Sequence, residues 1–184
     1  GNSKPHVWLA YPGETVVIDQ NLLPGTDGAA MDWRDGDASD AFIHGITFRD
    51  GWNHAFRMGI GNRFVFFKNR FLNMGPGMDG ANSSFIMFAL LSPTWHHLVK
   101  DNVFDTLNTG AFIKTYTTRY LVIEGNTFLN GSGNPLEGIA IKGSDQYMDV
   151  RGNTLDGNFG TGSINGNWHG GSNFEIRYNK IINA

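Results

Sequence analysis

Lysine and histidine side chains in this sequence could act as bases, cations and proton donors. Uronate β-elimination needs a base for the C5 proton, a cation that neutralises the carboxylate, and a proton donor for the leaving oxygen. Lys142, Lys114 and His169 have side-chain types that suit these roles. These three are our candidate catalytic residues.

Aromatic and arginine side chains could hold such a substrate, because rings stack on the apolar faces of sugars and guanidinium groups bind carboxylates. We expect the aromatic residues to lie in turns and loops. The alternative is that their rings pack on neighbouring loops and have no ligand. The candidate substrate-binding residues are Arg57, Trp95, Tyr116, Tyr147 and Trp168.

Metal chemistry has little support in the sequence. His96 and His97 are adjacent, and neighbouring residues on a strand face opposite sides, so the two cannot chelate one metal from a strand. Asp79, Glu137 and Asp145 could bind Ca²⁺, but three separated carboxylates are a nonspecific signal. The sequence also contains no G-x-S-x-G elbow, P-loop or dinucleotide-binding glycine motif.

Composition points to a single domain, 1–184, built from short strands. Charged residues make up only 17% of the chain and glycines number 25, which disfavours long helices. The net charge of −3 gives no general attraction to nucleic acid or to an anionic membrane. No stretch approaches the roughly 18 apolar residues of a membrane helix. The absence of cysteine excludes disulfides and thiolate chemistry.

A repeated asparagine organises the chain. Each copy has an apolar residue three positions before it and another two positions after it, as Phe66 and Phe71 flank the first. The steps between copies are 33, 24, 27 and 26 residues by subtraction. A unit of this length cannot bury its apolar face alone and must stack on its neighbours. The five copies are Asn69, Asn102, Asn126, Asn153 and Asn179.

The repeat predicts an all-β solenoid of about six to seven coils, each with three strands. We expect each asparagine to take left-handed backbone angles at a corner and to bond its amide to the asparagines above and below. Ile46 occupies the asparagine position in an earlier coil. The segment 24–41, rich in glycine and aspartate, is expected to be mostly loop.

Three segments carry a resemblance to a known family: Ile123-Glu124-Gly125-Asn126-Thr127-Phe128, Val150-Arg151-Gly152-Asn153-Thr154-Leu155 and the start of the chain over 10–19. With them the chain resembles the right-handed parallel β-helix of the pectate-lyase-like superfamily. Among the members of this superfamily, it most resembles the alginate-lyase-like and chondroitinase-B-like proteins. The resemblance implies a polysaccharide partner, anionic in character, and an extracellular or periplasmic location.

In that superfamily the site commonly lies on the outer face of the strand after the long loop. The resemblance places Lys114, Lys142 and the segment 165–169 there. Lys142 lies eight residues before Val150 and Trp168 lies eight before Ile176, so these two should be neighbours on adjacent rungs. Lys114 is expected within one residue of that column, with Arg57 two coils earlier. Where the family would carry an arginine, this chain has Trp168 and His169.

Three functions follow from this sequence. The leading one is a polysaccharide lyase that acts on a uronate-containing chain; the alternative for Lys142 is an exposed strand-end lysine that discourages edge pairing. The second is a non-catalytic β-helix that binds carbohydrate or serves as a structural or adhesin segment. The third is a glycoside hydrolase that uses Glu137 with Asp145 or Asp79.

The ends of the chain carry a separate expectation. Superfamily members usually have an N-terminal capping helix, whereas this sequence begins on a strand and stops on a rung at Ile181. It is therefore either a fragment of a longer helix without its caps or a solenoid whose ends pair with another chain.

Overall fold

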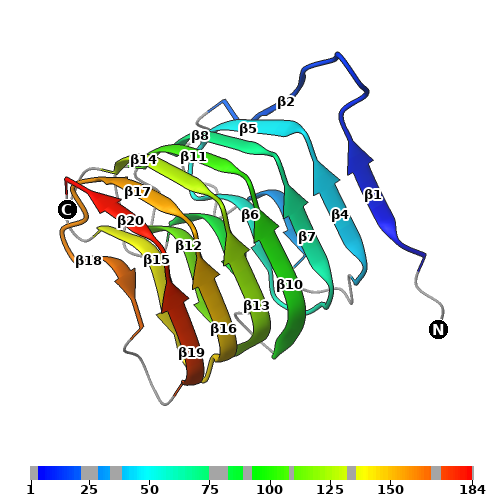
Figure 1. The fold of residues 1–184 in the computed structure, drawn as a ribbon. Helices are drawn as coiled ribbons and strands as arrows, with labels where there is room; N and C mark the ends of the chain where they lie inside the picture. The colour runs from blue at the N-terminus through cyan, green and yellow to red at the C-terminus, as the bar shows by residue number, and fades with distance from the viewer. Residues whose placement is uncertain are drawn as a thin grey trace.

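The computed structural model describes residues 4–21, 29–33, 39–74, 83–88, 93–107, 110–131, 136–166 and 171–183. Within these ranges every regular secondary-structure element is a β-strand, and every strand pairing is parallel. No helix there is long and apolar enough to cross a membrane. Figure 1 shows the strands stacked side by side around a common axis.

The strands form three sheets. Sheet A consists, in order, of β1 (His6–Leu9), β4 (Ala41–His44), β7 (Phe64–Phe67), β10 (Thr94–Lys100), β13 (Thr118–Glu124), β16 (Gln146–Arg151) and β19 (Ser172–Arg177). Sheet B consists of β2 (Val16–Asp19), β5 (Ile46–Gly51), β8 (Arg70–Met74), β11 (Val103–Leu107), β14 (Thr127–Gly131), β17 (Thr154–Gly157) and β20 (Lys180–Ile182). Sheet C consists of β3 (Ala29–Trp33), β6 (His54–Met58), β9 (Ser84–Phe88), β12 (Gly110–Tyr116), β15 (Leu136–Lys142) and β18 (Gly162–Asn165).

Consecutive strands enter sheets A, B and C in turn, so each coil adds one strand to every sheet. This arrangement confirms the predicted parallel β-helix. One strand within the described residues was not expected: β3 lies inside the segment 24–41. Its apolar residues, Ala29, Ala30 and Met31, are flanked by glycine and aspartate, which hid the strand from the pattern.

Stacked aromatic rings fill the interior at the position two residues after each asparagine. The rings of Phe48, Phe71, Phe104 and Phe128 lie within 8° of parallel, with centroids 5.2, 4.7 and 4.9 Å apart. Each is at most 1% exposed. The column continues with Leu155, which pairs in register with Phe128. The predicted apolar column is therefore the core of the molecule.

The asparagines form a continuous ladder at the corner between sheets A and B. The Asn102 amide Nδ2 donates to Asn126 Oδ1 at 3.0 Å and to the Phe66 carbonyl at 3.0 Å. The backbone N–H of Asn102 also donates to Asn126 Oδ1, at 2.9 Å. Equivalent bonds join Asn69 to Asn102, Asn126 to Asn153 and Asn153 to Asn179. The backbone N–H of Ile46 donates to Asn69 Oδ1, which confirms its place in the column.

The backbone role that we assigned to these asparagines is wrong. The left-handed residue at each corner is the one before the asparagine, as in Lys68 (φ 53°), Asp101 (φ 54°) and Gly125 (φ 65°). The ladder asparagines themselves do not take positive φ. The preceding residue turns the chain, and the asparagine is then free to point its amide into the coil.

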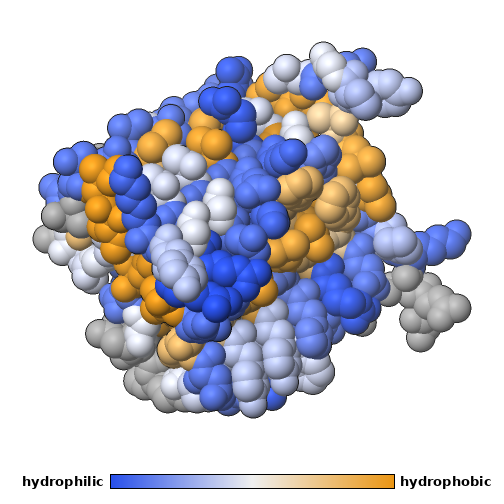
Figure 2. Space-filling view, viewed as in Figure 1, coloured by the Kyte–Doolittle hydropathy of each residue, from blue (hydrophilic) through white to orange (hydrophobic). Residues whose placement is uncertain are grey.

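Hydrophobic side chains reach the surface mainly at the ends of the described solenoid. Figure 2 shows them over β1 and β4, where Val7 is 57% and Leu9 is 54% exposed, whereas most of the visible face of sheet A is hydrophilic. Ion pairs join neighbouring coils on that face, through Lys100, Glu124, Arg151, Asp149 and Arg177.

Candidate functional site

The principal candidate residue, Lys142, forms an ion pair on sheet C. Lys142 Nζ lies 3.0 Å from Glu137 Oε2, and both residues belong to β15. Asn165 of β18 donates from Nδ2 to Glu137 Oε1 at 2.7 Å. The Lys142 side chain is only 16% exposed and that of Glu137 is 7% exposed. The expectation that Lys142 is an exposed strand-end lysine is therefore wrong, because its side chain is engaged along the sheet.

Tyr116 completes this group, which we call the Glu137 cluster: Tyr116, Glu137, Lys142 and Asn165. Tyr116 pairs in register with Lys142 on the adjacent rung, at the end of β12. Partial burial, with smaller contributions from the charges of Glu137 and Asp145, raises the pKa of its phenol. The hydroxyl therefore stays protonated at neutral pH and can serve as a proton donor.

Lys114 and Arg57 lie in a neighbouring column. Lys114 pairs in register with Met87 and Ala140, and Arg57 pairs with Met87. Lys114 therefore lies two residues from the column of Lys142, and the expectation that it lies within one residue is wrong. Arg57 lies in the column of Lys114, two coils earlier. Lys114 is fully buried and Arg57 is 2% exposed. Arg57 forms an ion pair with Asp32 at 2.7 Å.

Asp145 is a buried carboxylate in the turn between β15 and β16. It accepts hydrogen bonds from Thr115 Oγ1, at 2.6 Å, and from the backbone N–H of Thr118. Burial raises the pKa of this carboxyl group to about 6, although the hydrogen bonds oppose the shift. The corner of the preceding coil, between β12 and β13, uses the oxygens of Asp145 in place of a ligand.

The described aromatic candidates lie on strands, which corrects their expected placement in turns and loops. Trp95 is 42% exposed on β10, and Tyr147 is 47% exposed on β16. The Tyr147 ring stacks on Tyr120 at 4.7 Å, and Tyr120 stacks on His96 at 4.8 Å. All three stacked residues take left-handed angles, which turn their rings outward.

His96 and His97 face opposite sides, as expected. His96 is exposed in the aromatic stack, whereas His97 is 2% exposed and packs on Phe64 and Phe88. Among the described residues, no three His, Cys, Asp or Glu side chains are close enough together to hold a metal ion.

Three of the sequence-based candidates lie outside the described residues: His169, Trp168 and Asp79. Their predicted roles stay predictions. The register carries β15 into β18 through Ala140 and Asn165, the last described pair before that segment.

Sequence reasoning did not find the Glu137–Lys142 pair, because residues five apart on a regular strand face opposite sides. Glu137 has the same parity in β15 as the core residues Ile139 and Ile141, so its contact with Lys142 implies that Glu137 departs from the alternation. Asn165 begins the segment 165–169 that the resemblance places on this face, but its hydrogen bond to Glu137 had no local signal. Its partner, Glu137, is 28 residues away in the chain.

Comparisons with known proteins add no further constraint: no family model, curated protein or solved structure matches this chain. The parallel β-helix is therefore the class that the fold defines.

Proposed function

We propose that this chain is a carbohydrate-active β-helix that binds an acidic polysaccharide at the Glu137 cluster and cleaves it by β-elimination. One observation carries the proposal. A cation, an amide and a phenol with a raised pKa come together on adjacent rungs of sheet C, at Lys142, Asn165 and Tyr116. The likeness to pectate-lyase-like proteins and an extracellular or periplasmic location belong to the same proposal.

Each member of the cluster has a role that fits its position. Lys142, as an ammonium group, neutralises the uronate carboxylate, which makes the C5 proton more acidic. Its ion pair with Glu137 suits this role better than that of a base. Tyr116 gives its proton to the leaving oxygen. Asn165 orients Glu137 and so positions Lys142. The base is His169, which lies outside the described residues.

The test is the ultraviolet absorbance of the unsaturated product, measured with alginate, pectate and glycosaminoglycans. We expect Tyr116→Phe, which removes only the hydroxyl group, to lower turnover by about a hundredfold. Lys142→Met should lower it as well. Lys100→Met, which removes a lysine paired with Glu124 at 3.0 Å on sheet A, is the matched control and should leave turnover unchanged. Full activity in both cluster variants would remove the site.

A second candidate is a non-catalytic β-helix that binds carbohydrate or assembles end to end. The burial of Lys114 and Arg57 favours a non-catalytic role, because buried cations are poorly accessible to a polysaccharide substrate. Apolar side chains at both ends, among them Val7 and Ile181, favour assembly. Retention on a polysaccharide gel without cleavage would support binding, and concentration-dependent sedimentation would support assembly.

The hydrolase reading has less support. Glycoside hydrolysis needs two carboxyl groups that face one bound sugar. Glu137 is engaged with Lys142, and Asp145 is held inside a turn. Release of reducing sugar without ultraviolet absorbance would nevertheless favour this reading over elimination.

A further inference from the structure

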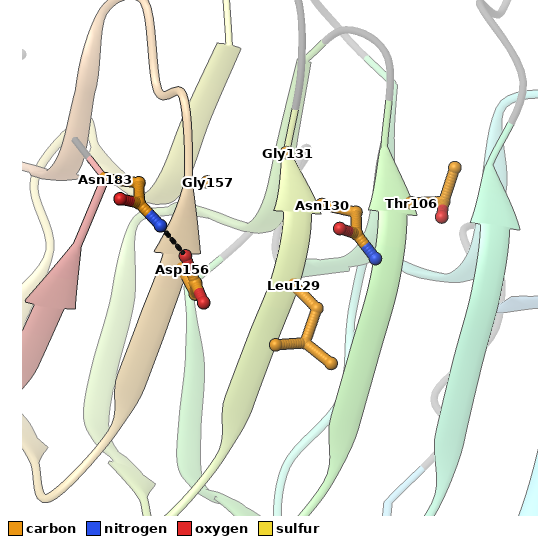
Figure 3. Close-up of a pocket in the computed structure, with 7 residues that line it drawn as sticks. All are labelled: Thr106, Leu129, Asn130, Gly131, Asp156, Gly157 and Asn183. Carbon is orange, nitrogen blue, oxygen red and sulfur yellow. Dashed lines mark hydrogen bonds between the residues drawn. The ribbon is translucent and has the colours of Figure 1, made fainter.

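A hollow of about 520 Å³ opens on sheet B, away from the Glu137 cluster. Figure 3 shows it at the ends of β14 and β17, with the side chains of Asn130 and Asp156 on neighbouring strands. Its lining combines carboxylate, amide, hydroxyl and apolar groups. The residues that line it are Thr106, Leu129, Asn130, Gly131, Asp156, Gly157 and Asn183.

The hollow lies where one column of the solenoid loses its side chains. Met74 and Leu107 pair in register and are fully buried. In the next two coils the same column holds Gly131 and Gly157. A Cβ atom added to Gly157 would lie 2.7 Å from the backbone N of Gly131, so this position cannot carry a side chain without a shift of the backbone. The backbones of β14 and β17 therefore approach each other closely at this edge of the hollow.

The polar groups around the hollow are held in place by one another. Asn130 Nδ2 donates to Asp105 Oδ1 at 2.7 Å, and Asn183 Nδ2 donates to Asp156 Oδ1 at 2.8 Å (Figure 3). A carboxylate has about four lone-pair sites and an amide oxygen has two. Both pairs therefore keep acceptor capacity for the hydroxyl groups of a ligand.

Charge and shape indicate which sugar would fit. Asp105 does not line the hollow itself but adjoins the lining residue Thr106. Asp105, Leu129 and Asp156 follow one another in one column, so the two carboxylates are roughly 10 Å apart with an apolar side chain between them. None of the seven described lining residues is lysine or arginine. Acceptors on both sides of an apolar patch suit hydroxyl donors and the C–H face of a pyranose ring, and they disfavour a carboxylate.

We propose that this hollow is a binding subsite for a neutral, hydroxyl-rich sugar residue. The sugar lays its apolar face on Leu129 and donates hydroxyl hydrogen bonds to Asp105 and Asp156. The subsite does not depend on elimination chemistry, since it uses no residue of the Glu137 cluster. It gives the protein a second carbohydrate contact that prefers an uncharged sugar, whereas the cluster prefers an anionic one.

Arg49 suggests a variant that closes the hollow without harming the fold. Arg49 stands in the same column as Leu129 and forms an ion pair with Asp19 of the adjacent coil at 2.6 Å. In Leu129→Arg, the new guanidinium group would lie between Asp105 and Asp156 and fill the space. Val122→Arg is the matched control, because Val122 also lies one rung before an aspartate, Asp149, on a different sheet.

Titration calorimetry of the full chain with neutral tetrasaccharides of mannose, glucose and galactose, and with tetragalacturonate, tests the proposal. We expect at least one neutral probe to bind. Leu129→Arg and Asn130→Ala should weaken its binding by about tenfold or more. Val122→Arg should bind normally. So should Asn73→Ala, which breaks an equivalent amide–carboxylate pair with Asp50 outside the hollow.

Three outcomes would overturn the subsite: no neutral probe binds, Leu129→Arg binds as the unmodified chain does, or tetragalacturonate competes equally for the hollow. Loss of neutral binding with intact ultraviolet product formation in Leu129→Arg would show two separate sites. A failure of elimination with intact neutral binding would remove only the function proposed for the Glu137 cluster.

Discussion

His97 is a titratable side chain enclosed by the core. Its Nδ1 accepts a hydrogen bond from the backbone N–H of Phe64 at 3.3 Å, and its ring packs on Phe64 and Phe88. Burial, with a smaller contribution from His96, lowers the pKa of His97 from 6.5 to about 3. The folded protein therefore requires neutral His97, whereas the unfolded chain protonates it near its ordinary pKa.

This difference predicts acid sensitivity. The stability from His97 is fully present above pH 6.5 and is lost as the pH falls from 6.5 toward 3. The free energy of unfolding should drop by about 5 kcal/mol across that window. In His97→Asn, the amide oxygen can replace Nδ1 as acceptor and cannot be protonated there. Urea unfolding at pH 7, 5 and 4 should show a flatter profile for this variant, and an unchanged slope would contradict the assignment.

Lys142 and Glu137 are coupled more tightly than an exposed lysine would be. Lys142→Met leaves a buried carboxylate with only Asn165 beside it, so we expect a loss of about 3 kcal/mol in the free energy of unfolding. The double variant Lys142→Met/Glu137→Met removes both charges and should be more stable than Lys142→Met alone. Strictly additive losses in urea unfolding would show that the pair does not interact.

At the scale of the element, the asparagine ladder joins strands that are far apart in sequence. Asn126 donates to the Val99 carbonyl at 2.9 Å and to Asn153 Oδ1 at 3.0 Å, and it accepts two bonds from Asn102. Asn126→Ala would remove hydrogen bonds to buried groups on both neighbouring coils. We expect a cost of about 4 kcal/mol, measured as the change in the urea unfolding free energy.

The last member of the ladder provides the comparison. Asn179 is bonded to Asn153 and to the Val150 carbonyl and lies at the edge of the described solenoid. Asn179→Ala should therefore cost about half as much as Asn126→Ala. Equal costs at the two positions would mean that the amide-to-amide bonds contribute little to stability.

At the scale of the whole molecule, the sequence was sufficient for the architecture. The asparagines and the flanking apolar residues, such as Phe66 and Phe71, recur once per coil, so a single period reveals both the corner and the core. The pattern failed at β3, where glycine and aspartate surround a short apolar run. It also misplaced the left-handed angle by one residue, because several residue types, such as Lys68, hold that position.

The candidate site was less accessible from sequence. The strand register places Tyr116 beside Lys142. Counting residues along the coils had instead placed Lys114 close to the column of Lys142. Burial of Lys114 depends on what covers the outer face of sheet C, and periodicity within a strand carries no information on that. The hollow on sheet B is lined by residues of several coils, such as Thr106, Leu129 and Asp156, and only the alignment of the coils brings them together.

The amide ladder also gives the solenoid an electrical direction. In every step the coil nearer the N-terminus donates, and the coil nearer the C-terminus accepts through Oδ1. The bonds between parallel strands leave only small net dipoles, but these side-chain dipoles all point the same way and add. A coil stacked beyond Asn179 must therefore present an oxygen at that place, so this spiral can be extended, by nature or by design, in one orientation only.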